Sequence, residues 1–200
     1  TGSAAVFAGI LSIATIPTIL LSPIGGILAD RADRRNIMVA LDTLTGIFVL
    51  CAAVFLSGDN AVVVISVLLV ILSVLGAFET PTVQACIPQM LAGDNIIKGN
   101  AVVNQVASIS YLIAPLLGGI LYSAVGLKPV MYASVVCFFI TALFECFIRL
   151  GYQVREFPGN VLSMVKNDFS GSIRFIMKER PDIMKMLLLA AFSRFFVMGV

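Results

Sequence analysis

The sequence has no histidine and no tryptophan, and only 12% of its 200 residues are charged. The absence of histidine excludes histidine metal ligands, Ser-His triads and histidine proton relays from this chain. No CxxC pair occurs among its four cysteines, which all lie in or beside apolar stretches: Cys51, Cys86, Cys137 and Cys146. We therefore expect buried, unpaired cysteines, with no metal site and no disulfide framework.

The chain is rich instead in apolar residues, which make up 60% of it and give a mean hydropathy of +1.05. Soluble domains are about 45–50% apolar and about 25% charged, so a soluble core could not hide this much apolar surface. The composition predicts an all-α, multi-pass membrane protein with the lipid bilayer as a partner. The net charge of +2 is small and the basic residues are not massed together, so we expect no nucleic-acid partner.

Five apolar runs are long enough to cross a bilayer as helices, which takes about 20 residues each. We expect them at residues 4–29, 37–56, 61–83, 101–125 and 130–148, with a sixth beginning near Ile183. A polar connector at 86–100 separates the third run from the fourth. The chain opens without a methionine and stops inside an apolar run, so we expect it to be a piece of a longer protein.

Residues 150–181 differ from the rest because they are rich in arginine and lysine. Within them, apolar residues recur at helical spacing opposite the basic ones: Leu162, Val165, Phe169, Ile173 and Ile176. This pattern predicts an amphipathic helix on the membrane surface, and a soluble linker helix is the alternative.

The basic residues also predict how the runs are oriented. Three arginines follow the first run, Lys98 follows the third, and the basic segment follows the fifth, whereas the alternate loops hold only Lys128. Because cytoplasmic loops carry the excess of lysine and arginine, we expect these three loops to be cytoplasmic in the cell membrane. The chain then begins outside, and one further span precedes residue 1.

The loop after the first run carries a charged motif. The pattern G-x-L-A-D-R-x-x-R-R is matched at Gly26, Asp30, Arg31, Arg34 and Arg35. This segment resembles the signature loop between helices 2 and 3 of the major facilitator superfamily, where a glycine usually stands in place of Asp33. The resemblance implies a latch that holds the two halves of a transporter in the outward-open state, with a charged loop that only enforces topology as the alternative.

Simple chemistry suits the motif to that role. Gly25 and Gly26 lack side chains, so a neighbouring helix can approach closely. Asp30 follows the apolar run, where it can cap a helix N-terminus or pair with an arginine.

A second motif lies in the fourth run, where residues 110–119 read SYLIAPLLGG. It resembles the antiporter motif of exporters in the same superfamily, at Ser110, Ala114, Pro115, Gly118 and Gly119, with serine and alanine standing in for glycines. Small residues four apart also form a common face for helix packing, which is the alternative reading.

Further stretches resemble the macrolide-efflux and enterobactin-exporter-like branch, from TGSAAVFAGI at the start to SGSIRFIMKERPDIMKMLLLA after the basic segment. The resemblance covers nearly the whole chain and implies helices 2 to 7 of a facilitator-type bundle. The implied organisation is an N-terminal half at 1–149 that lacks its first helix, a linker at 150–181, and the first helix of the second half at 182–200. The missing helices of the full-length chain are then partners of this part.

Ionisable residues within spans are costly and are functional candidates by default. Asp42, Glu79 and Glu145 lie near the expected cytoplasmic surface, which favours pairing with arginines there over a proton relay at the bilayer centre. Arg194 lies deeper, where it could meet an unseen acid or an anionic substrate, unless its span begins later.

Polar residues of the fourth run could line a cavity or act as hydrogen-bonding contacts between helices: Asn104, Gln105, Ser108 and Tyr111.

The resemblance implies a secondary transporter that exports small hydrophobic or amphipathic compounds, such as drugs, macrolides or siderophore-like molecules. It implies alternating access and proton antiport, with no cofactor and the proton gradient as the energy source. Solute uptake by the same fold and a non-transporting sensor or scaffold are the alternatives. No Walker, HExxH or GxSxG motif occurs, which argues against ATP-driven transport within this chain and against a membrane enzyme.

Overall fold

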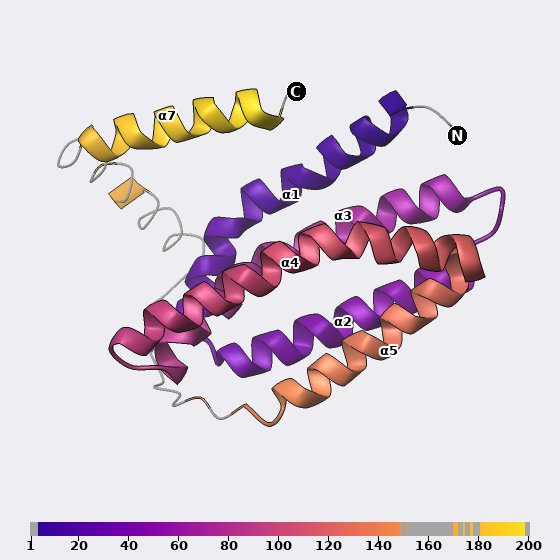
Figure 1. Cartoon of the computed structure of the whole chain (residues 1–200), viewed down its shortest axis with the longest axis horizontal. Helices are drawn as coiled ribbons and strands as arrows, with labels where there is room; N and C mark the ends of the chain where they lie inside the picture. The colour runs from indigo at the N-terminus through magenta and orange to yellow at the C-terminus, as the bar shows by residue number, and fades with distance from the viewer. Residues whose placement is uncertain are drawn as a thin grey trace. The chain divides into compact units, whose positions relative to one another are not determined.

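The structure, a computed structural model, describes residues 4–148, 150, 170, 171, 174, 177 and 181–198. Over these residues the elements are all helical: α1 (Ala4–Arg31), α2 (Arg34–Phe55), α3 (Ala61–Met90), α4 (Asp94–Val125), α5 (Leu127–Glu145) and α7 (Pro181–Met198). Figure 1 shows the ribbon with these labels. The helices α1 to α5 belong to one compact unit, residues 1–155, and α7 belongs to a second, residues 156–200.

Five helices, α1 to α5, are long and apolar enough to cross a membrane. Each begins within a few residues of its predicted start except α4. The predicted polar connector at 86–100 is wrong, because α3 continues through Pro88 to Met90 and α4 already begins at Asp94. The turn between them is short and passes through Gly93, whose φ of 57° is a conformation that favours glycine. Polar composition alone does not end a helix, since its backbone hydrogen bonds continue wherever no residue breaks them.

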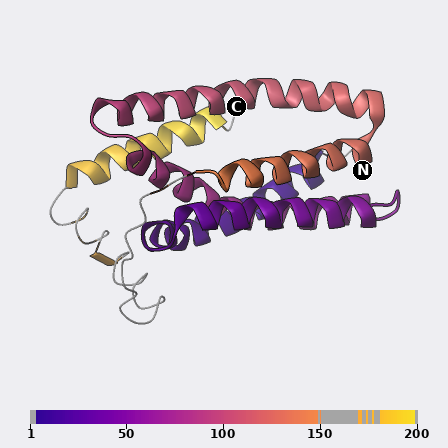
Figure 2. The ribbon, with the colours of Figure 1, turned by 90° about the horizontal axis from the view of Figure 1, so that it is seen from below.

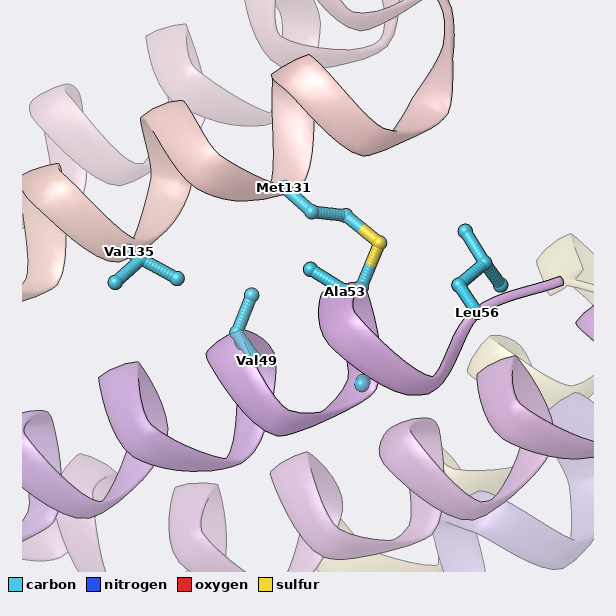
Figure 3. Packing of buried hydrophobic residues seen from close by; sticks show 6 residues of the cluster. Val49, Ala53, Leu56, Met131 and Val135 are labelled. Carbon is cyan, nitrogen blue, oxygen red and sulfur yellow. The ribbon is translucent and has the colours of Figure 1, made fainter.

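The helix α2 is the centre of the unit, since it packs extensively on both α5 and α3 (Figure 1). Its buried residues recur every three or four positions, which places them on one face: Leu41, Asp42, Thr45, Gly46, Val49, Ala52 and Ala53. In Figure 3, Val49 and Ala53 point from α2 toward Met131 and Val135 of α5. Further along, Phe138 and Phe139 of α5 lie against Gly46, where an added Cβ would come within 3.4 Å of them.

These contacts define the register of α2 against α5. Ala53 lies at the level of Met131, and Gly46 lies at the level of Phe138, so one helix rises as the other descends. The two helices are therefore antiparallel, and the beginning of α2 meets the end of α5.

The helices α1 and α3 form the other extensive pair, and they run parallel. Ala14 and Thr18 contact Ser73, and Gly25 contacts Ala77 further along both chains. Hence α1, α3 and α5 all end where α2 and α4 begin. We call this end of the unit the charged end.

The helix α4 contacts α3 and α5 only sparsely and buries none of its residues within the described structure. In Figure 2 it is the magenta-to-salmon helix that runs the length of the unit. Its long exposed face is apolar, as expected for a helix that meets lipid or further helices.

The helix α7 begins at Pro181, close to the predicted start of the sixth run, and Lys185 lies 3.8 Å from Asp182 in its first turns. It carries three charges and is not one of the five helices that meet the length and composition of a span. The predicted amphipathic linker falls mostly outside the described residues.

Candidate functional site

At the charged end, the side chain of Arg34 connects three helices. Its Nε donates to the Ala29 carbonyl at 2.6 Å, and its Nη1 donates to the Ala85 carbonyl at 2.8 Å. Its Nη2 lies 3.4 Å from Oδ1 of Asp30, which makes an ion pair across the turn between α1 and α2. The Arg34 side chain is only 13% exposed, so one guanidinium ties the end of α1 to α3 from the first residue of α2.

The turn between α1 and α2 is closed by Asp33. Its side chain accepts a 3.1 Å hydrogen bond from the backbone N–H of Arg35, so Asp33 is the N-cap of α2. Its φ of −67° is an ordinary conformation, and glycine is not needed at this position. Asp30 lies within α1 and pairs with Arg34, so pairing, not capping, is its role here.

The carbonyl that Arg34 reaches on α3 precedes a proline. Pro88 has no N–H to donate to the carbonyl four residues before it, which is that of Gln84. Arg34 therefore donates to the carbonyl next to the one that Pro88 leaves without its helical donor, in the turn that the proline weakens.

The same arrangement recurs on α1. Ser73 of α3 donates from Oγ to the carbonyl of Ala14, which lies three residues before Pro17. The hydroxyl of Thr18 lies 2.6 Å from that of Ser73. Two hydroxyls thus join the helices at the first proline bend of α1, as polar side chains do between membrane helices.

A third proline, Pro81, lies between these two contacts. The hydroxyl of Thr82 donates to the Phe78 carbonyl at 2.6 Å, three residues before Pro81. A Cβ added at Gly25 would lie 2.4 Å from the carbonyl oxygen of Ala77, four residues before it. Only glycine allows α1 to approach this carbonyl so closely.

The two glycines of the first motif thus differ. Gly25 is buried against α3, but nothing lies within 4 Å of a Cβ built on Gly26. The expectation that both permit close approach is confirmed for Gly25, whereas no described helix lies close to Gly26 and the expectation for it stays a prediction. The side chain of Arg31 lies outside the described residues.

Three carboxylates lie near the charged end, on three different helices: Asp42 of α2, Glu79 of α3 and Glu145 of α5. Asp42 and Glu145 are 5% and 9% exposed, and Glu79 is partly buried. Each of the two buried acids lies close enough to the other two carboxylates to interact electrostatically with them. We expected these acids to pair with arginines, but none forms an ion pair with a described basic residue; Arg34 is engaged by Asp30.

The second motif lies on the exposed face of α4. Ser110, Ala114 and Pro115 line a hollow together with Ala107 and Tyr111. Nothing lies within 4 Å of a Cβ built on Gly118 or Gly119, so no described helix occupies the predicted packing face. Its role in helix packing stays a prediction.

Of the predicted cavity-lining residues, Tyr111 lines the hollow and is 83% exposed. Asn104, Gln105 and Ser108 are exposed on the same helix, where Ser108 donates to the Asn104 carbonyl at 2.8 Å. Arg194 lies in α7, but its side chain is outside the described residues.

The cysteines depart from expectation. All four are unpaired, as predicted, but only Cys86 is buried; its Sγ lies 3.5 Å from Sδ of Met38. Cys51, Cys137 and Cys146 are exposed, because they lie on helix faces that no described element covers. No group of three or more His, Cys, Asp or Glu side chains in the described part is arranged to hold a metal ion.

Sequence reasoning missed Ser73, Thr18 and the carbonyl acceptors of Arg34. A usable signal existed, because each proline inside an apolar run leaves a weakened turn that a polar residue on a neighbour can serve. The pairing itself requires the register of α1 and α2 against α3, which the sequence does not state.

These observations define a multi-pass helical membrane protein in which a charged turn ties three helices together. The family model of the Major Facilitator Superfamily matches residues 1–200. The chain belongs to this superfamily, a family of membrane transporters and not of enzymes, which confirms the predicted family and fold class.

Among curated proteins, the chain is 24% identical over 206 residues to "Macrolide efflux protein A" of Streptococcus pyogenes, covering 100% of this chain and 49% of that protein. It is 25% identical over 191 residues to the protein of the same name in Enterococcus faecalis, covering 92% and 57%. It is also 24% identical over 193 residues to the uncharacterized MFS-type transporter YkuC of Bacillus subtilis, covering 92% and 43%. The chain spans about half the length of these relatives, and no solved structure matches it.

Proposed function

We propose that the full-length protein is a secondary exporter of small hydrophobic or amphipathic compounds, of the macrolide kind, driven by proton antiport. The observation that carries this proposal is the similarity to proteins named for macrolide efflux, which covers the whole chain in the first of them. Superfamily membership supports transport by alternating access, in which two helical halves expose a midplane site to either side.

The charged end is the cytoplasmic end in this proposal. The arginines of the α1–α2 turn and Lys98 near the start of α4 lie there, and basic residues are retained on the cytoplasmic side during insertion. The open face of α4, with the hollow at Tyr111, then meets the remaining helices of the full-length chain and contributes to the substrate path.

Asp30 and Arg34 act as the latch of this exporter. Arg34 keeps its two carbonyl bonds while its 3.4 Å contact to the largely exposed Asp30 is the weakest of the three. Asp30 is thus free to exchange partners when the halves move, whereas Arg34 holds α1 and α3 in place.

The test is efflux from cells that produce the full-length protein and are loaded with a fluorescent macrolide. We expect efflux that a protonophore abolishes and that Asp30→Asn reduces at least severalfold. Asp59→Asn, in the exposed turn between α2 and α3, is the matched control and should export normally. Inward accumulation would show uptake instead, and ligand binding without any flux would show a sensor or scaffold; either result overturns the proposal.

A further inference from the structure

The three carboxylates near the charged end have no assigned role in the latch. Their position follows from the register of α2. Ala53 meets Met131 (Figure 3) and Gly46 meets Phe138, so the same register brings Asp42 opposite the buried Ala142, and Glu145 follows about one helical turn further along α5.

The register against α3 places Glu79 in the same layer. Met38 of α2 meets Cys86, and Phe48 lines one hollow with Ile71. Asp42 lies between these two levels on α2, and Glu79 lies between them on α3. Asp42 and Glu79 therefore lie at similar depth, and Glu145 lies about one helical turn nearer the charged end.

The carboxylates are buried and not neutralised by the described side chains. Asp42 is 5% exposed and Glu145 is 9% exposed, and Oε2 of Glu145 is a buried acceptor without a hydrogen-bond partner. Glu145 interacts electrostatically with both Asp42 and Glu79. Like charges on neighbouring carboxylates repel one another, and one bound proton removes part of that repulsion.

The described charged side chains at this end form no ion pair with the three carboxylates. Arg34 is held by Asp30 and two carbonyls, and Nε of Arg35 is buried without a hydrogen-bond partner. The groups at this end are, from α1, Asp30 and Arg31; from the turn and α2, Asp33, Arg34 and Arg35; from α3, Cys86; from α4, Asp94 and Lys98; and after α5, Cys146.

The identity of the ligand follows from space and ligand chemistry. The described side chains offer no group of three suited to a metal ion. The two hollows described above are not lined by any of the three carboxylates. A proton needs no cavity.

We propose that Asp42, Glu79 and Glu145 form one proton-binding site that couples protonation to the packing of α2 on α3 and α5. This inference rests on the proposed function, since it names the residues that would bind the antiported proton. A bound proton removes one negative charge and lets the three helix ends pack together. Release of the proton to water at the charged end restores mutual repulsion between carboxylates on three different helices and loosens that end.

The direct test is infrared spectroscopy of the purified full-length protein, which detects the carbonyl stretch of a protonated carboxyl group. We expect the band at neutral pH in the wild type, reduced in amplitude at least twofold in Glu145→Gln and in Asp42→Asn. Asp59→Asn, whose carboxylate is exposed at the opposite end, is the matched control and should keep the full band. A wild type without the band, or a band unchanged in both cluster variants, overturns the proposal.

A second measurement needs no variant, which covers the case where a cluster variant does not fold. Dicyclohexylcarbodiimide reacts with protonated carboxyl groups in apolar surroundings, and mass spectrometry locates the adduct. We expect the adduct on Asp42, Glu79 or Glu145 of the wild type and less of it as pH rises. Labelling confined to exposed carboxylates such as Asp59 contradicts the proposal.

Transport separates this inference from the proposed function. We expect Glu145→Gln to retain the exchange of labelled for unlabelled substrate across the membrane. The factor by which a pH gradient accelerates export should be at least tenfold smaller in this variant than in the wild type. Proton-driven export that is unchanged in all three cluster variants overturns the proton site and leaves the exporter standing. A wild type that shows the band but moves no substrate overturns the exporter and leaves the proton site standing.

Discussion

Arg34 donates a 2.8 Å hydrogen bond from Nη1 to the backbone carbonyl of Ala85, three residues before Pro88 of α3. The same guanidinium bonds the Ala29 carbonyl near the end of α1 at 2.6 Å. Arg34, which its motif assigns to a loop, therefore takes part in the packing of α1 on α3. A side chain from a neighbouring helix donates in the same way to the carbonyl of Ala14, three residues before Pro17 of α1.

Replacement of Arg34 should weaken the charged end. Arg34→Lys keeps the charge, but a lysine ammonium lacks the planar fork that serves three acceptors at once. We expect a loss of about 2 kcal/mol of stability in Arg34→Ala and a smaller loss in Arg34→Lys, since hydrogen bonds from charged donors are worth about 1.5–3 kcal/mol. Thermal unfolding of the full-length protein in detergent measures both. Lys98→Ala, an exposed residue at the same end, should unfold like the wild type, and equal losses in all three variants would contradict this account.

The neighbouring glycines should respond in opposite ways to the same substitution. Gly25→Ala places a Cβ 2.4 Å from the carbonyl oxygen of Ala77, so α1 must move away from α3. Overpacking of this kind costs about 1–3 kcal/mol. Gly26→Ala meets nothing within 4 Å and should be neutral or stabilising by about 0.5–1 kcal/mol, because alanine favours the helix. Thermal unfolding compares the two, and equal sensitivity would show that the α1–α3 contact is not as close as described.

The hydroxyls of Thr18 and Ser73, at the bend of α1, should stabilise the protein less than Arg34 does. Ser73→Ala removes the donor to the Ala14 carbonyl and the partner of Thr18. We expect a loss of about 0.6 kcal/mol, the average for hydrogen bonds between membrane helices. Ser66→Ala is the control, because Ser66 on the same helix bonds only the Val62 carbonyl within α3. If Ser66→Ala loses as much stability as Ser73→Ala, the interhelical hydrogen bond is not the cause of the loss.

The cap of α2 predicts a graded series at one position. Asp33→Ala removes the acceptor for the Arg35 N–H and should cost about 1 kcal/mol, whereas Asp33→Gly should cost only a few tenths. Asp33→Ser restores a capping oxygen and should be close to the wild type. Unfolding midpoints for the three variants check the order, and a glycine variant less stable than the alanine variant would contradict the capping role.

The sequence predicts the helices well because apolar length is a strong constraint in a membrane. It also identifies Asp30 and Arg34, since five charges within six residues are conspicuous between apolar runs. Its polar composition predicts a connector at 86–100, but α3 continues to Met90 with Pro88 in its last turn, and α4 begins at Asp94.

The partners of Arg34 and the burial of Asp42 beside two other carboxylates could not be predicted from the sequence. Both depend on helix register, and a shift of one residue rotates a side chain by about 100° around its helix. Asp30 and Asp33 both lie within four residues of Arg34 in the sequence, yet its side chain contacts Asp30 and two carbonyls. Neither Arg34 nor Arg35 forms an ion pair with Asp42, Glu79 or Glu145, and pairing with Arg31 or Arg149, whose side chains lie outside the described residues, stays a prediction.

Purified full-length protein in lipid vesicles tests the central claim most directly. The vesicles receive an imposed pH gradient, acidic inside, and a permanently charged dye such as ethidium is added outside, since such a dye is not trapped by protonation. Proton antiport predicts that protons leave as dye enters, so dye should accumulate only in vesicles that hold both protein and gradient, and a protonophore should release it. Equal dye movement with and without the gradient, or accumulation only when the outside is acidic, would contradict proton-driven export.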